Sequence, residues 1–168
     1  MIHIQLTKVE RLPELTMCWY DVDDYYFFAH FSKRESGQKL WRISRDTLTF
    51  SLFPDGKRLQ SIDSYCPCFN WHRERELSFP TLPSVYYDIH FIADFNVING
   101  IGRIDDSDLR IQYHISDNDR LLRIIFEEKT DSHFLLAPNV AVGICADNVL
   151  SELLFDGLMK CGDRRIVK

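Results

Sequence analysis

The sequence predicts a mainly β protein of the α+β class, in which an antiparallel sheet packs against one helix near the C-terminus. Three observations support this fold class. Apolar and polar residues alternate with a period of two in many segments, turn-forming residues separate these segments, and only residues 149–160 show a helical period. We expect about seven to nine strands, arranged as an open curved sheet or a partly closed barrel with the helix packed on it.

The stretch 84–131 shows the clearest strand pattern. Every odd position over 85–97 is apolar or aromatic, and most even positions are polar. A period of two over this length is typical of a strand with one buried face. Asn99-Gly100 favours a hairpin turn, and the alternation resumes over 109–115 and again over 122–126. The stretch therefore predicts a meander of three neighbouring strands.

The N-terminal part predicts shorter strands. Apolar residues alternate over 2–6, and the aromatic content of 25–31 favours a strand over a helix. Residues 48–52 and 59–65 flank Pro54-Asp55-Gly56, a strong turn sequence, so these two segments should form a hairpin. The neighbouring aromatic residues of 19–28 are expected in the core, and any exposed members would serve as anchors of an interface.

A proline-rich loop over 66–83 divides this N-terminal β block from the central meander. A domain boundary in the loop would leave each half with fewer than about 100 residues, which is short for a domain. We therefore expect one domain over 1–168.

The C-terminal part predicts two short strands and then the helix. The strands should cover 134–136 and 140–145, with Asp147 or Asn148 as the helix cap. The helix should run over 149–160, because four leucines form a stripe at helical spacing there. These are Leu150, Leu153, Leu154 and Leu158.

Composition indicates a folded protein with reduced thiols. Of its 168 residues, 45% are hydrophobic and 13% aromatic, which is enough for a sizeable core. The first residues lack the charge and apolar pattern of a signal peptide, and no run of about 18 apolar residues exists. Five cysteines, an odd count, are typical of a protein kept in a reducing compartment. These features predict a cytoplasmic protein that does not enter a membrane.

The net charge of −5 comes entirely from the central stretch. Residues 84–132 carry 10 acidic and 5 basic side chains, whereas the parts before and after are neutral. An acidic sheet face repels nucleic acid and attracts basic proteins. We therefore expect a basic protein partner and no nucleic-acid binding. The expected contact residues are Asp88, His90, Asp94, Asp105, Asp106, Asp108 and His114.

Motifs that would indicate catalysis or a bound cofactor are absent from the sequence. It contains no nucleophile elbow, no phosphate-binding glycine loop, no H-E-x-x-H motif and no dinucleotide fingerprint. Cys66-Pro67-Cys68 lacks the second ligand pair of a structural zinc site. The aspartate runs 21–24 and 105–108 do not match an EF-hand loop. We therefore expect neither metal nor cofactor, and the absence of motifs argues against an enzyme.

These observations favour a small cytoplasmic protein-binding module. An inhibitor or immunity-type protein that neutralises a basic partner, such as a toxin or nuclease, is one form that such a module takes. Two alternatives stay open. The first is a β-barrel-like binder of a small apolar ligand. The second is a hydrolase or metal enzyme that uses His90, His114 or the Cys66/Cys68 loop.

Overall fold

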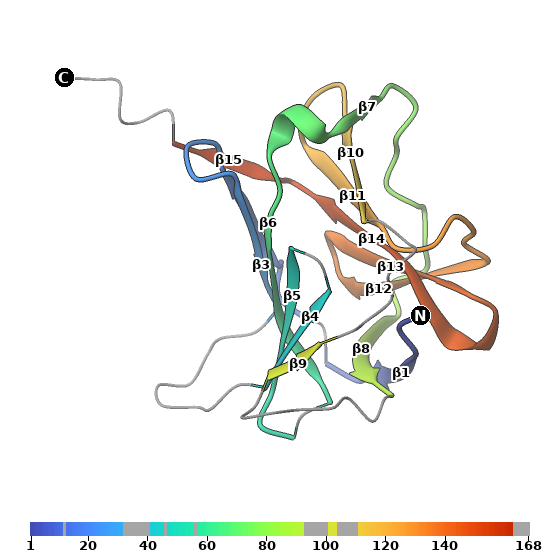
Figure 1. Ribbon diagram of the computed structural model, residues 1–168. Helices are drawn as coiled ribbons and strands as arrows, with labels where there is room; N and C mark the ends of the chain where they lie inside the picture. Colours follow the sequence, from blue (N-terminus) through green and yellow to red (C-terminus); the bar gives the residue numbers. More distant parts are fainter. Residues whose placement is uncertain are drawn as a thin grey trace.

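In a computed structural model, the described part of the chain forms fifteen strands in two mixed sheets (Figure 1). The structure describes residues 1–11, 13–31, 41–45, 47–55, 57–92, 101–103 and 111–162. Within these residues there is no α-helix, and so no helix of the length and apolar character needed to cross a membrane. The single-domain organisation stays a prediction.

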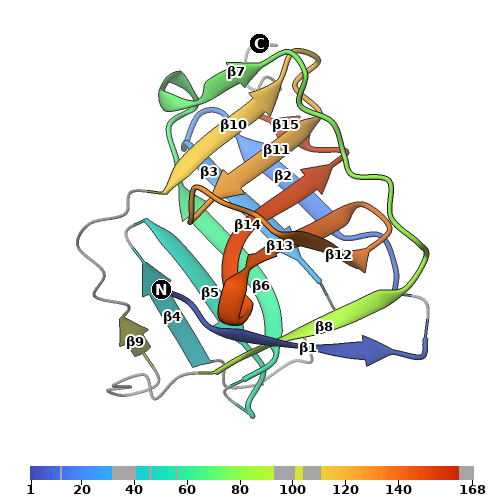
Figure 2. The ribbon, with the colours of Figure 1, turned by 90° about the vertical axis from the view of Figure 1, so that its right-hand side faces the viewer.

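The first sheet has eight strands in the order β1-β8-β12-β13-β14-β11-β10-β7. Its neighbours are antiparallel except at β8–β12 and β10–β7, which are parallel. Figure 2 looks onto this sheet, with β14 near its centre. The strands are β1 (Ile4–Val9), β7 (His72–Glu74), β8 (Tyr86–Phe91), β10 (Gln112–Ser116), β11 (Leu121–Ile125), β12 (Ser132–Ala137), β13 (Val140–Cys145) and β14 (Val149–Asp156).

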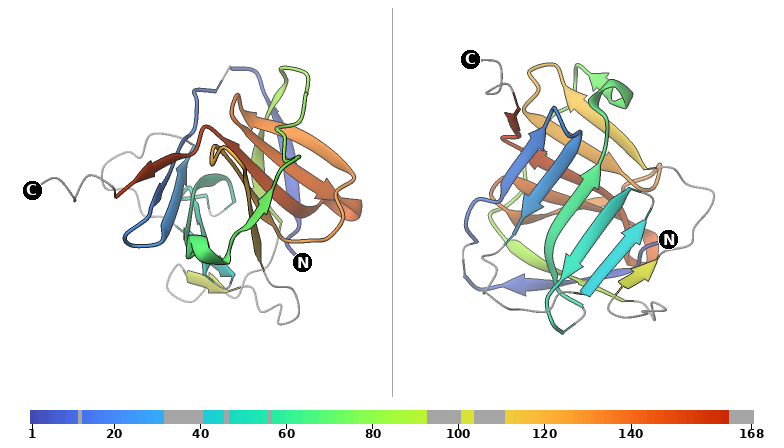
Figure 3. Two further views of the ribbon diagram at one scale, coloured as in Figure 1. Left: turned by 90° about the horizontal axis from the view of Figure 1, so that it is seen from above. Right: turned by 60° about the vertical axis from the view of Figure 1, so that its left-hand side comes forward.

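The second sheet has the order β15-β2-β3-β6-β5-β4-β9, with parallel pairs at its two ends. The right-hand view of Figure 3 looks onto this sheet, with the first sheet behind it. Its strands are β2 (Met17–Asp21), β3 (Tyr26–His30), β4 (Trp41–Arg45), β5 (Leu48–Leu52), β6 (Leu59–Tyr65), β9 (Ile101–Arg103) and β15 (Met159–Cys161). The described residues also form two short 3-10 turns, η1 (Cys68–Asn70) and η2 (Ala146–Asn148).

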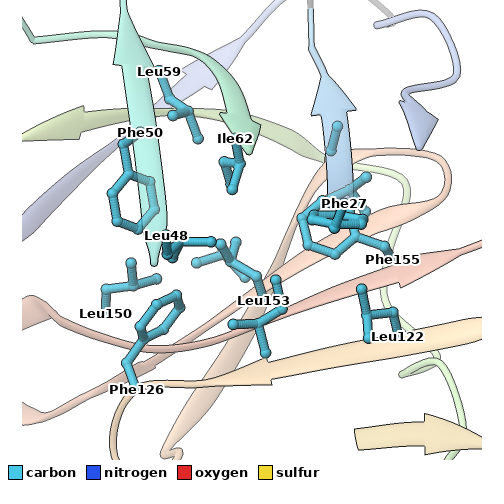
Figure 4. Packing of buried hydrophobic residues seen from close by; sticks show 14 of the residues in the cluster. Phe27, Leu48, Phe50, Leu59, Ile62, Leu122, Phe126, Leu150, Leu153 and Phe155 are labelled. Carbon is cyan, nitrogen blue, oxygen red and sulfur yellow. The ribbon is translucent and has the colours of Figure 1, made fainter. Parts of the chain in front are cut away.

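The hydrophobic core lies between the two sheets (Figure 4). Phe27 on β3 meets Phe155 on β14 with ring centroids 5.1 Å apart, and Phe50 on β5 meets Phe91 on β8 at 5.0 Å. Each ring comes from a position where its strand faces the other sheet, as a period of two requires. The inner faces of the two sheets therefore share one apolar layer. We call the opposite side of each sheet its outer face.

The chain passes from the first sheet to the second at Gly157. Strand β14 ends at Asp156 and β15 begins at Met159, so two residues make the crossing. Gly157 has a φ of +77°, in the left-handed region that suits glycine. The Asp156 carboxylate accepts a hydrogen bond from the Gly157 amide at 2.8 Å, which fixes the turn.

The helix predicted over 149–160 is wrong, because these residues form β14 and β15. The register shift between β13 and β14 leaves Ser151 without a partner, as in a β-bulge. Leu150 and Leu153 both join the core, although they are three residues apart. Leu154 packs on the outer face instead. A bulged strand that is buried on both faces thus reproduces the leucine spacing of a helix.

The predicted meander over 84–131 is also wrong as a set of neighbouring strands. Strands β10 and β11 do form a hairpin, but β12, β13, β14 and β11 lie between β8 and β10. Strand β9 belongs to the second sheet. The Asn99-Gly100 turn lies outside the described residues. A single antiparallel sheet is likewise replaced by two mixed sheets that do not close into a barrel.

The hairpin predicted around Pro54-Asp55-Gly56 is confirmed as β5 and β6, which pair antiparallel. The Asp55 carboxylate accepts hydrogen bonds from the amides of Lys57 at 2.9 Å and Arg58 at 3.0 Å. An aspartate side chain that binds the backbone two and three residues later stabilises a tight turn. The mainly β class is therefore confirmed, and its best-predicted parts are those with local turn chemistry.

Candidate functional site

The predicted contact residues are only partly described and do not form one cluster. Asp88 and His90 lie on β8, and His114 lies on β10, with four strands between. They therefore cannot act together as a catalytic or metal-binding group. The other four residues lie outside the described residues, so their role stays a prediction. These are Asp94, Asp105, Asp106 and Asp108.

Two of the described contact residues already have charged neighbours. Asp88 lies 4.0 Å from the Arg58 guanidinium, and both side chains are partly exposed. The Nδ1 atom of His114 lies 3.0 Å from a Glu74 carboxylate oxygen. The Asp88 carboxylate is thus partly neutralised by a base from elsewhere in the chain, whereas His114 faces a carboxylate. Exposed pairs of this kind contribute little to stability, but they reduce the field that a basic partner would meet.

A buried carboxylate organises the outer face of the first sheet. Glu152 on β14 is only 2% exposed. The Arg123 Nε on β11 donates a hydrogen bond to one of its oxygens, and the His133 Nε2 on β12 lies at hydrogen-bonding distance from the other. Arg123 also lies 3.7 Å from Glu74. Because every charge here has a partner within the sheet, we interpret this network as structural.

Gly143 provides the space in which Glu152 lies. The two residues are direct cross-strand partners on β13 and β14. A Cβ atom on Gly143 would lie 2.5 Å from the Glu152 Cγ and 2.8 Å from the Thr130 Cγ2. Glycine is therefore required here for close packing.

A segment of the proline-rich loop covers part of the same outer face. Leu77, Phe79 and Leu82 pack over a small apolar cluster of the first sheet. Figure 2 shows this green segment running from β7 towards β8 along the edge of the sheet. The cluster consists of Leu121, Leu135, Ala141 and Leu154. This apolar area is thus already buried within the chain.

The outer face of the second sheet is different, because large apolar side chains stay exposed there. Cross-strand register places Met159, Trp19 and Phe28 in one row over β15, β2 and β3. The rings of Trp19 and Phe28 are 4.6 Å apart. Met17 is 58% exposed and Met159 is 52% exposed.

A second group of rings continues this surface. Tyr26 on β3 is the cross-strand partner of Tyr65 on β6. Tyr25 lies edge-on to Tyr65 at 6.4 Å and to Phe69 at 5.6 Å, and Phe69 is 72% exposed. Tyr25 has a φ of +53°, a region that is strained for a bulky residue. We call the whole set the exposed apolar surface, in which Trp19, Tyr25 and Phe28 are half-buried and the others are exposed. Its members are Met17, Trp19, Tyr25, Tyr26, Phe28, Tyr65, Phe69 and Met159.

Carboxylates border the exposed apolar surface. Asp21 accepts hydrogen bonds from the amides of Asp23 at 3.0 Å and Asp24 at 3.2 Å, so the turn holds three acidic residues together. Asp63 on β6 is the cross-strand partner of Phe28. Burial raises the pKa of Asp63, although Tyr26 and Arg42 oppose this shift. Burial and the charge of Asp63 together raise the pKa of Tyr26 to about 12.

The sequence pattern could have indicated part of this surface. Residues alternate in burial along β2 and β3, so Tyr20 and Phe27 enter the core while their neighbours Trp19 and Phe28 face outwards. Aromatic residues on both faces of a strand show no apolar–polar alternation. The sequence therefore did contain a signal, namely an excess of aromatic residues along these two strands. Only the structure shows which of these rings lie on the outer face.

The Cys66-Pro67-Cys68 segment does not assemble a metal site. Among the described residues, no three His, Cys, Asp or Glu side chains are grouped so that they could hold a metal ion. Cys66 is buried, Cys68 is exposed, and both are free thiols. Burial raises the pKa of the Cys66 thiol to about 12 and that of Cys18 to about 11.

We predict that iodoacetamide modifies Cys68 in the folded protein and spares Cys66 and Cys18. At about pH 8, a thiol with a pKa near 12 is a thiolate in only about one molecule in ten thousand, and burial also blocks access. Mass spectrometry after timed labelling measures the difference, and labelling in urea should modify all three. Equal rates at Cys66 and Cys68 in the folded protein would contradict this placement.

No protein-family model matches the chain, and no curated protein sequence is similar to it.

Proposed function

We propose that this chain is a protein-binding module that holds a basic protein partner against the outer face of its second sheet. One observation carries the proposal: the exposed apolar surface is bordered by carboxylates. Four of its members with large exposed side chains lie on strands of one sheet face, namely Met17, Tyr26, Tyr65 and Met159. An inhibitor or immunity-type protein of the cytoplasm fits such a surface.

The side chains on this surface are the kinds that anchor protein interfaces. Tyr and Trp present a large apolar area with few rotatable bonds, and they are enriched among residues whose removal weakens binding most. Methionine adapts its shape to the partner. Because the rings of Trp19 and Phe28 already contact each other in a row with Met159, this part of the surface is preorganised and loses little ordering entropy on binding.

Charge determines the kind of partner. Asp21, Asp23 and Asp24 form one turn beside Tyr25, and Asp63 lies within the sheet face. A partner rich in lysine and arginine would place its charges on this rim while an apolar centre fills the middle. The overall charge of −5 acts in the same direction at longer range. The acidic residues of 84–132 thus contribute to the proposal through the rate of encounter.

The test begins with covalent cross-linking in the native cell and continues with the purified complex. We expect Tyr65→Ser and Met159→Ser each to weaken binding at least about tenfold, as loss of an interface anchor does. Ile92→Ser is the matched control, because Ile92 and Met159 are both 52% exposed and Ile92 follows β8 in the first sheet. This control should change binding less than about twofold.

Reversing the charge of rim aspartates tests the electrostatic contribution to binding separately from that of the apolar anchors. Asp23→Lys with Asp24→Lys should slow association and reduce its salt dependence. If the partner is a toxin or nuclease, its activity should fall in proportion to the fraction of partner that this chain has bound. Binding that survives Tyr65→Ser and Met159→Ser but is lost with Ile92→Ser or Asp88→Lys would overturn the proposed surface and favour the first sheet.

A further inference from the structure

A cavity opens beside the exposed apolar surface, lined by residues from the end of β6, from η1 and from the start of β10. Its volume is about 770 Å3. Pockets that bury a small organic molecule commonly have about 300 to 1,000 Å3. Its lining includes Tyr65, Pro67, Asn70, His72, Gln112 and Tyr113.

One wall of the cavity is a fixed aromatic ring. The hydroxyl of Tyr113 lies 2.6 Å from the Ser64 Oγ, so the two form a buried hydrogen bond between the sheets. Trp71 stacks on the Tyr113 ring at 6.4 Å with an angle of 18° between the planes. The Trp71 indole in turn donates to the Cys66 carbonyl at 3.1 Å. The ring of Tyr113 is therefore held in place before any ligand arrives.

The lining is mixed, more apolar than polar, and its described residues carry no fixed charge. Among the described residues that line it, the polar groups are hydroxyls, two side-chain amides, one imidazole and one thiol, with no Asp, Glu, Lys or Arg. Burial keeps the Cys66 thiol protonated, because it raises the pKa of that group. A charged ligand would meet no opposite charge among these lining residues, whereas an uncharged aromatic ligand would gain apolar contact with them.

We infer that this cavity binds an uncharged small molecule that contains an aromatic ring and one or two hydrogen-bonding groups. The ring would lie against Tyr113, and its polar groups would meet Asn70 and Gln112. This inference is independent of the proposed protein partner. Only Tyr65 belongs to both the cavity and the exposed apolar surface, so the test leaves Tyr65 unchanged.

The test uses three probes of similar shape and different charge: 2-naphthol, naphthalene-2-sulfonate and 2-naphthylmethylammonium. Isothermal titration of the full chain at neutral pH should give saturable binding of one 2-naphthol with a dissociation constant of about 0.1 mM. Each charged probe should bind at least about tenfold more weakly. Equal affinity for a charged probe would overturn the assignment of ligand class.

A substitution that fills the cavity tests whether 2-naphthol binds there. Gln112→Trp places a large ring at the cavity wall, and Gln5→Trp is the matched control, because both glutamines are exposed on strands of the first sheet. We expect Gln112→Trp to weaken 2-naphthol binding at least about tenfold and Gln5→Trp to leave it unchanged. Circular dichroism confirms that both variants fold. No saturable binding up to about 1 mM, or binding that a folded Gln112→Trp leaves unchanged, would overturn the inference.

Discussion

Phe155→Ala should lower the free energy of unfolding by about 3 to 5 kcal/mol, the usual cost of removing a buried phenylalanine ring. Phe155 is fully buried, and its ring lies 5.1 Å from that of Phe27 and 6.4 Å from that of Phe31. Phe155 belongs to the first sheet, whereas Phe27 and Phe31 belong to β3 of the second sheet or follow it directly. Truncation of Phe155 therefore leaves a cavity where the two sheets contact each other. Urea unfolding followed by tryptophan fluorescence measures the loss.

Phe69→Ala is the matched control for this substitution. It removes the same ring from a side chain that is 72% exposed, so the free energy of unfolding should change by less than about 0.5 kcal/mol. Similar losses for the two variants would contradict the burial of Phe155 and the strand assignment of 149–156 on which it depends.

Gly143→Ala should lower the free energy of unfolding by about 1 to 3 kcal/mol, the cost of overpacking a tightly packed site. In an open site the same change often stabilises a protein, since alanine restricts the unfolded chain. Here the new Cβ would meet the Glu152 Cγ at 2.5 Å. Glu152 cannot move aside easily, because Arg123 and His133 hold its two oxygens.

A double-mutant cycle tests this explanation. In a Glu152→Ala background, the Cγ atom is absent and Gly143→Ala should cost less than it does alone. Thr130→Ser should relieve part of the remaining conflict, because it removes the Cγ2 atom 2.8 Å from the new Cβ. Strictly additive losses in both cycles would show that the steric contact is not the cause.

The sequence predicted local features well and non-local ones poorly. The β5–β6 hairpin and the β10–β11 hairpin are set by short turns, so each could be predicted from neighbouring residues. The place of β8 beside β1 and β12 depends on pairing with residues far away in the chain. An alternating pattern shows that a strand has a buried face, but it does not name the partner strands.

The helix prediction failed for a related reason. One residue without a partner on β13, Ser151, shifts the register of β14. The segment with Leu77, Phe79 and Leu82 buries the outer face of the same strand. Because of both effects, positions that would be polar on an ordinary half-buried strand are buried and apolar here. The resulting spacing of the leucines resembles the apolar stripe of a helix. Neither a bulge nor a covering segment leaves a signal within 149–156 itself.

The candidate site was only indirectly visible in the sequence. The charge imbalance of 84–132 drew attention to acidic residues, yet Asp88 lies near Arg58 from the hairpin of the second sheet. The rings of Trp19 and Phe28 were expected in the core, because apolar side chains usually are. Both rings are half-buried on the outer face of the second sheet, and a strand pattern alone cannot show which rings lie on that face.

The position of β14 has a consequence for the order in which the molecule assembles. Its two neighbours in the sheet, β13 and β11, both leave the ribosome before it does. Until β14 arrives, each of them presents an unpaired row of backbone amides and carbonyls, the kind of edge on which chains aggregate. The first sheet is thus completed from its middle, and the same short segment then crosses at Gly157 to join the second sheet. Synthesis of residues 149–161 therefore supplies a strand to each sheet at nearly the same moment.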